Sequence, residues 1–117
     1  ILGGYSLAGL FSLWSAYKSN TFSGIAATSP SVWFNGWEEF MNKNTPLSNA
    51  IYLSLGDTEE KTKNKVMSAV GNNIRKQEEL LKNDNINTIL EWNKGGHFSD
   101  SGLRVAKAFV WCIEILC

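Results

Sequence analysis

The sequence predicts an α/β protein in which a parallel β-sheet is flanked by helices. Short apolar segments typical of buried strands alternate along the chain with longer segments whose apolar residues recur every three or four positions. Strands separated by helices pair in parallel through right-handed crossovers, and ligands of such sheets bind at the carboxyl ends of the strands. The chain has 117 residues, of which 44% are hydrophobic and 19% are charged, and it shows no internal repeat. We therefore expect residues 1–117 to form one domain.

The expected elements alternate between strand and helix. A strand that includes Ile1 and Leu2 leads into a helix from Leu7 to about Ser19, whose apolar spacing predicts that it lies almost fully buried against the sheet. The segment 22–28 is expected to be a short apolar strand that Ser29-Pro30 closes, since the residue before a proline is pushed out of helical geometry. The later elements are an aromatic-rich segment over 31–41, a strand over 50–55, a long amphipathic helix from about 59 to 82, a strand over 86–92 and a helix over 99–116.

The segment Gly4-Tyr5-Ser6-Leu7-Ala8-Gly9 places a lone serine where the first strand turns into the first helix. This pattern is typical of a nucleophile elbow, in which a strained turn holds the serine Oγ above the sheet. Strand and helix can pass closely only if the residues two before and two after the serine are small, and Gly4 and Ala8 meet that demand. The alternative is that Ser6 is a helix N-cap, since a serine before an apolar periodic run is a common helix start.

Two further segments stand downstream of Ser6 in the order that a Ser–acid–His triad requires. The single histidine, His97, follows the strand expected over 86–92, and the acidic turn 56–60 follows the strand expected over 50–55. In α/β-hydrolases the nucleophile, the acid and the histidine occur in this order along the chain. The chain opens inside a strand and is shorter than such a domain. We therefore interpret it as the C-terminal half of an α/β-hydrolase fold, which begins at the nucleophile strand and lacks the loop that supplies half of the oxyanion hole.

Four segments together resemble the esterase family of α/β-hydrolases that includes esterase D and the enterochelin (ferric siderophore) esterases. They are Gly-Tyr-Ser-Leu-Ala-Gly at 4–9, Ser-Pro-Ser-Val-Trp-Phe at 29–34, Gly-Asp-Thr-Glu at 56–59 and Gly-His-Phe at 96–98. The resemblance implies a serine hydrolase that cleaves carboxylic esters, with Ser6 as nucleophile and His97 as base. In such hydrolases the acid usually stands three residues beyond the glycine that ends its strand, which indicates Glu59. Asp57 is the alternative acid, and both carboxylates would also favour a helix N-terminus without any catalytic role.

The remaining candidate site residues are an oxyanion donor and a substrate pocket. The backbone N–H of Leu7, the residue after the nucleophile, is expected to bind the oxyanion. Tyr5, Trp33, Phe34 and Trp37 are the expected pocket residues, because aromatic side chains at strand ends suit an apolar acyl or aryl group. The aromatic cluster over 31–41 fits a short helix that packs on the core equally well. The expected partner is a small-molecule ester, either a siderophore or another acyl or aryl ester.

Composition excludes several other classes of function. The 11 acidic and 11 basic residues give a formal net charge of zero, which removes the electrostatic case for nucleic-acid binding. No apolar run approaches the roughly 18 residues that a membrane-spanning helix needs, no signal peptide is visible, and we expect a cytoplasmic location. Cys112 and Cys117 fall in one expected helix at a spacing unsuited to a disulfide, and no Cys/His cluster suggests zinc. We expect neither a metal nor a cofactor.

A function without catalysis is the competing interpretation. The chain would then be a catalytically incomplete hydrolase fragment that acts as an interaction or regulatory module. A first strand with no neighbour exposes backbone hydrogen-bonding groups and an apolar face, which favours self-association through that strand.

Overall fold

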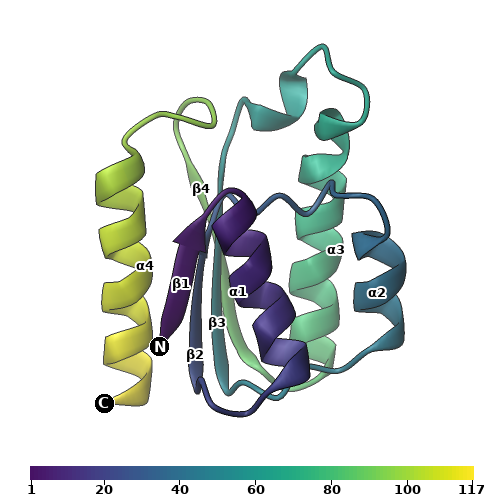
Figure 1. Cartoon of the computed structure of the whole chain (residues 1–117). Coiled ribbons are helices and arrows are strands. Elements are labelled where there is room, and N and C mark those ends of the chain that lie inside the picture. The colour runs from purple at the N-terminus through teal and green to yellow at the C-terminus, as the bar shows by residue number, and fades with distance from the viewer.

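A computed structural model describes residues 1–117 as a four-stranded sheet whose strands all pair in parallel, in the order β1-β2-β3-β4 (Figure 1). The strands are β1 (Leu2–Tyr5), β2 (Gly24–Thr28), β3 (Ala50–Gly56) and β4 (Asn87–Asn93). The helices are α1 (Leu7–Lys18), α2 (Trp37–Lys43), α3 (Val70–Asn83) and α4 (Ser101–Leu116). The predicted α/β class, a parallel sheet with flanking helices, is confirmed.

Helices cover both faces of the sheet. Figure 1 shows α4 alone on one side of the strands, with α1, α2 and α3 on the other. The larger core lies on the side of the three helices and includes Leu13, Ile25, Leu53 and Ile74. A smaller cluster under α4 contains Ala26, Tyr52, Ala108 and Cys112. The central strands β2 and β3 are buried along their whole length, as expected for parallel strands that are covered on both faces.

The strand register brings the carboxyl ends of the strands to one edge of the sheet. Tyr5 pairs with Thr28, and Thr28 pairs with Ser54. Ser6 and Ser29, the residues that follow the first two strands, therefore lie next to each other at this edge.

Strand β1 and helix α1 pass very close to each other just after the turn at Ser6. A Cβ atom added at Gly4 would lie 2.6 Å from the backbone and the Cβ of Ala8. Only glycine fits at this position, which is the packing reason for small residues on both sides of the serine.

Helix α1 is less buried than its sequence pattern predicts. Leu13 is fully buried, but Leu7, Phe11 and Trp14 are 60%, 58% and 41% exposed. These three residues form a second apolar stripe at positions i, i+4 and i+7, and no other element of the structure covers it. The apolar residues of this helix thus form two separate stripes, and only one of them is buried.

The helix predicted over 59–82 begins only at Val70. The segment before it contains two short 3₁₀ turns, η1 (Glu59–Lys61) and η2 (Met67–Ala69). The Asn64 side chain accepts hydrogen bonds from the backbone amides of Val66 and Met67 at 3.0 and 3.1 Å, which replaces the helical bonding pattern there. Val66, which falls on the apolar side of the amphipathic pattern over 59–82, is exposed.

No helix in the structure is long and apolar enough to cross a membrane. Both cysteines are free, with Cys112 buried in α4 and Cys117 exposed after its end.

Candidate active site

Ser6 sits in a strained turn between β1 and α1. Its backbone has φ 62° and ψ −120°, a positive φ that non-glycine residues rarely adopt. The Ser6 amide donates to the Thr28 carbonyl at 3.0 Å, and the Ser6 carbonyl accepts from the Ser31 amide at 3.1 Å. These bonds to the end of β2 hold the turn in place. Such strain typically costs about 1 to 3 kcal/mol and persists only where the surroundings enforce it.

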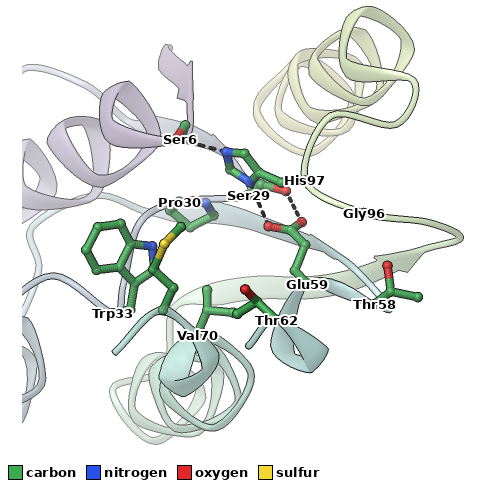
Figure 2. Close-up of a pocket in the computed structure, with 11 residues that line it drawn as sticks. Ser6, Ser29, Pro30, Trp33, Thr58, Glu59, Thr62, Val70, Gly96 and His97 are labelled. Atoms are coloured by element: carbon green, nitrogen blue, oxygen red, sulfur yellow. Dashed lines mark hydrogen bonds and ion pairs between the residues drawn. The ribbon is translucent and has the colours of Figure 1, made fainter. Parts of the chain in front are cut away.

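His97 reaches Ser6 from the loop between β4 and α4. Its Nε2 lies 3.0 Å from Ser6 Oγ (Figure 2). The imidazole packs against the ring of Tyr5 at a centroid distance of 5.1 Å and against the edge of Phe98 at 4.9 Å. Two rings therefore restrict its orientation, while Phe98 itself projects into solvent.

Glu59 is the carboxylate that meets the histidine. Its Oε1 lies 2.7 Å from His97 Nδ1, and its side chain is 6% exposed. Asp57 is exposed, and its Oδ1 accepts a hydrogen bond from the Gly95 amide at 3.0 Å instead. Of the sequence-predicted residues, the structure thus brings Ser6, His97 and Glu59 into one hydrogen-bonded chain and leaves Asp57 outside it.

The loops that carry Glu59 and His97 are tied to each other by their backbones. The amides of Asp57 and Thr58 donate to the carbonyls of Asn93 and Gly95 at 2.7 and 3.1 Å. A Cβ atom at Gly56 would lie only 2.4 Å from the Gly95 carbonyl oxygen, so this glycine permits the contact. The acid and the histidine therefore share one rigid support.

The second carboxylate oxygen of Glu59 also has a full set of partners. Glu59 Oε2 accepts from the Ser29 hydroxyl and from the Gly56 amide, both at 2.6 Å. The guanidinium of Arg104 on α4 lies 3.6 Å from the same oxygen and donates to Ser29 Oγ. Sequence analysis did not identify Ser29 and Arg104 as site residues, because no spacing along the chain links a serine after β2 to an arginine inside the last helix.

A cavity of about 220 Å³ opens beside Ser6 and His97. Its lining combines hydroxyl groups with a few apolar side chains: Ser6, Ser29, Pro30, Trp33, Thr58, Glu59, Thr62, Met67, Val70, Gly96 and His97. Of the four predicted pocket residues, only Trp33 lines it, and Tyr5 lies against His97 instead.

Phe34 and Trp37 lie elsewhere than predicted. Trp37 is buried in the core, where its indole N–H donates to Gln77 Oε1 at 2.9 Å. Both residues line a separate apolar groove of about 420 Å³ along α1. The aromatic segment turns sharply between Ser31 and Gly36, so neighbouring aromatic residues point to different sites.

The Leu7 amide is the first of α1, directly after the candidate nucleophile. Amides in the first turn of a helix have no acceptor within the helix, and the helix dipole makes this end electropositive. The position therefore suits a donor to a developing oxyanion. No cluster of three or more His, Cys, Asp or Glu side chains with metal-binding geometry occurs in the structure.

No protein-family model and no curated protein sequence matches the chain. The solved structures that resemble it include two siderophore hydrolases. The siderophore hydrolase EstA from Aspergillus nidulans matches with a TM-score of 0.69 and 16% identity over 98% of this chain and 48% of its own. The siderophore hydrolase EstB from the same organism matches with a TM-score of 0.67 and 18% identity over 92% of this chain and 46% of its own.

At these identities the likeness shows a shared α/β fold. The chain spans about half the length of the solved structures that it matches.

Proposed function

We propose that this chain carries the catalytic residues of a serine esterase, with Ser6 as nucleophile, His97 as general base and Glu59 as the acid that orients the histidine. The observation that carries the proposal is the hydrogen-bonded chain from Ser6 Oγ through His97 to Glu59, with distances of 3.0 and 2.7 Å. A serine at a strained strand-to-helix turn, a base within reach and a carboxylate behind the base are the parts that acyl transfer requires.

In the first half of the reaction, Ser6 Oγ attacks the carbonyl carbon of the ester while its proton moves to His97 Nε2. The negative charge on the substrate oxygen is stabilised by the Leu7 amide, and loss of one such donor costs about 2.7 to 4 kcal/mol of transition-state stabilisation. The imidazolium then gives its proton to the leaving alcohol as the tetrahedral intermediate collapses to an acyl-enzyme. Glu59 stabilises the imidazolium and fixes the tautomer that leaves Nε2 free to accept the proton.

In the second half, water attacks the acyl group on Ser6 while His97 again takes up a proton. Collapse of the second intermediate returns that proton to Ser6 Oγ and releases the carboxylic acid. His97 is 27% exposed at its side chain, so water reaches it directly.

The substrate we propose is a small ester with an acyl or aryl group. The cavity beside Ser6 offers one aromatic wall, Trp33, together with the hydroxyl groups of Thr58 and Thr62. This mixed lining suits an ester that also carries polar groups. Siderophore esters belong to this class, and the two similar solved structures are named siderophore hydrolases.

The proposal is tested by measuring ester hydrolysis by the Ser6→Ala variant of the full-length protein. With an activated aryl acetate as substrate, we expect kcat to fall by roughly 10⁴-fold or more, because no other group can form the acyl-enzyme. Ser101→Ala, at an exposed position at the start of α4, is the matched control and should retain the wild-type rate. Full activity in a folded Ser6→Ala variant contradicts the assignment.

Assays with several classes of ester distinguish a serine esterase from a catalytically incomplete hydrolase module. Hydrolysis of aryl, short acyl or siderophore esters by the wild type supports an esterase. A folded wild-type protein that hydrolyses none of them supports the competing interpretation, a catalytically incomplete hydrolase module.

A further inference from the structure

Arg104 is a charged side chain held inside the protein next to the candidate site. It lies on α4, its side chain is 2% exposed, and its Nε is buried without a hydrogen-bond partner. A buried guanidinium is costly unless an opposite charge lies close to it. The nearest carboxylate is that of Glu59, whose Oε2 is 3.6 Å from Arg104 Nη2.

A relay of hydrogen bonds strengthens this ion pair. Arg104 Nη2 donates to Ser29 Oγ, and Ser29 Oγ donates in turn to Glu59 Oε2 at 2.6 Å. The Gly56 amide donates to the same oxygen at 2.6 Å. Glu59 Oε2 is therefore saturated with donors, and Oε1 is left to accept from His97.

We propose that Arg104 is a positioning residue, which acts through Ser29 and Glu59 Oε2 to hold the carboxylate in the orientation that His97 requires. This inference rests on the proposed esterase function and adds a residue from α4 to the site. Arg104 touches neither Ser6 nor His97. Its guanidinium also donates to the Ser99 carbonyl at 3.4 Å, in the loop that carries His97, so the route through Glu59 has to be tested against a route through this loop.

Arg104 also places a positive charge beside the Glu59–His97 pair. Tyr5 and Tyr52 face Arg104 from β1 and β3, and burial raises the pKa of both phenols, so both stay neutral in the range where imidazole titrates. Asp57 and Asp100 are exposed carboxylates of the two adjoining loops. Glu60 is paired with Arg75 on α3 at 2.6 Å, and Glu91, which accepts from Tyr52, is paired with Lys107 at 3.0 Å. Removing the Arg104 charge should therefore favour proton uptake by the pair, whichever partner holds the proton.

Arg104→Met in the full-length protein is the main test, since methionine has a similar length and no charge. We expect kcat to fall by roughly 10- to 100-fold with little change in KM, because a displaced carboxylate misaligns the base. The acid limb of the rate–pH profile should move to higher pH. Arg75→Met, which breaks the exposed pair with Glu60, is the matched control and should change neither quantity.

A double-mutant cycle with Glu59→Gln shows whether Arg104 acts through Glu59. If it does, Arg104→Met should have almost no further effect on kcat in the Glu59→Gln background. Equal losses in both backgrounds overturn the proposal, and so does a folded Arg104→Met variant with wild-type kcat and pH profile.

Two milder variants keep the inference testable if Arg104→Met does not fold. Arg104→Lys retains the charge and should leave the pH profile in place while kcat falls. Ser29→Ala removes the relay and should lower kcat, again with no further loss in the Glu59→Gln background. Wild-type kinetics in both variants overturn the proposal.

NMR titration of the His97 imidazole separates this inference from the esterase proposal. Its resonances can be assigned with His97→Gln, and its midpoint is measured without any substrate. We expect the titration midpoint to rise in Arg104→Met whether or not the protein hydrolyses esters. If the midpoint rises in a protein that hydrolyses no ester, the esterase proposal fails and the role of Arg104 stands. An unchanged midpoint in an otherwise active enzyme contradicts the role of Arg104 alone.

Discussion

Glu59 and Asp57 stand two residues apart in one acidic turn, yet their surroundings differ sharply. Glu59→Gln should lower kcat by roughly 10⁴-fold, because an amide neither stabilises the imidazolium nor fixes the required tautomer. The thermal unfolding midpoint of Glu59→Gln should fall as well, because Arg104 loses its charge partner. The kcat values must therefore be compared at a temperature well below that midpoint.

Asp57→Asn is the control for that prediction. The asparagine oxygen can still accept the hydrogen bond from the Gly95 amide, so we expect kcat close to wild type. A large loss of kcat in Asp57→Asn with none in Glu59→Gln would show that the wrong carboxylate had been assigned.

At the scale of single residues, the sequence was informative where chemistry is tied to local spacing. The small residues around Ser6 indicated it as the candidate nucleophile, and the resemblance to hydrolases whose acid stands three residues beyond a glycine indicated Glu59. Arg104 has no such mark, because a buried arginine on an amphipathic helix reads like an ordinary surface charge. Its partner lies 45 residues away in sequence and becomes visible only when α4 packs beside the sheet edge.

At the scale of elements, the turn between β1 and α1 depends on Gly4. Gly4→Ala should lower the free energy of unfolding by about 1 to 3 kcal/mol, because the new methyl group overlaps Ala8 at 2.6 Å. Gly102→Ala is the control, since a Cβ atom there meets nothing within 4 Å and α4 should be unaffected or gain up to about 1 kcal/mol. Chemical denaturation of both variants measures the difference, and equal stabilities would contradict the close passage of strand and helix.

The late start of α3 and the misplaced pocket aromatics have local physical causes, while the alternative reading of 31–41 as a short helix packed on the core agrees with α2. The pattern over 59–82 continues across residues that are not helical, because Asn64 caps the amides that a longer helix would use. The aromatic segment over 31–41 contains no single face, since its turns direct Trp33 to the cavity and Trp37 to the core. Hydrophobic periodicity does not record where the backbone turns.

At the scale of the whole molecule, the alternation of strands and helices was enough to predict a parallel sheet with its site at the carboxyl edge. The strand order β1-β2-β3-β4 then places Ser6, Glu59 and His97 at the ends of β1, β3 and β4. The His97 side chain reaches from the loop after β4 to Ser6 at the end of β1, and Glu59, from the loop after β3, contacts it on the way. The loops after β3 and β4 are also bonded to each other through their backbones. Self-association through β1, an edge strand of this sheet, stays a prediction.

The central claim is that Ser6 is an activated nucleophile, and mapping of a fluorophosphonate adduct tests it most directly. The full-length protein is treated with the probe, digested and examined by mass spectrometry, with His97→Gln as a parallel sample. We expect one adduct on the peptide that contains Ser6, and we expect it to be lost or strongly slowed in His97→Gln because the base is missing. An adduct on Ser29 or Ser31 instead, or no adduct in a protein that hydrolyses esters, would contradict the account.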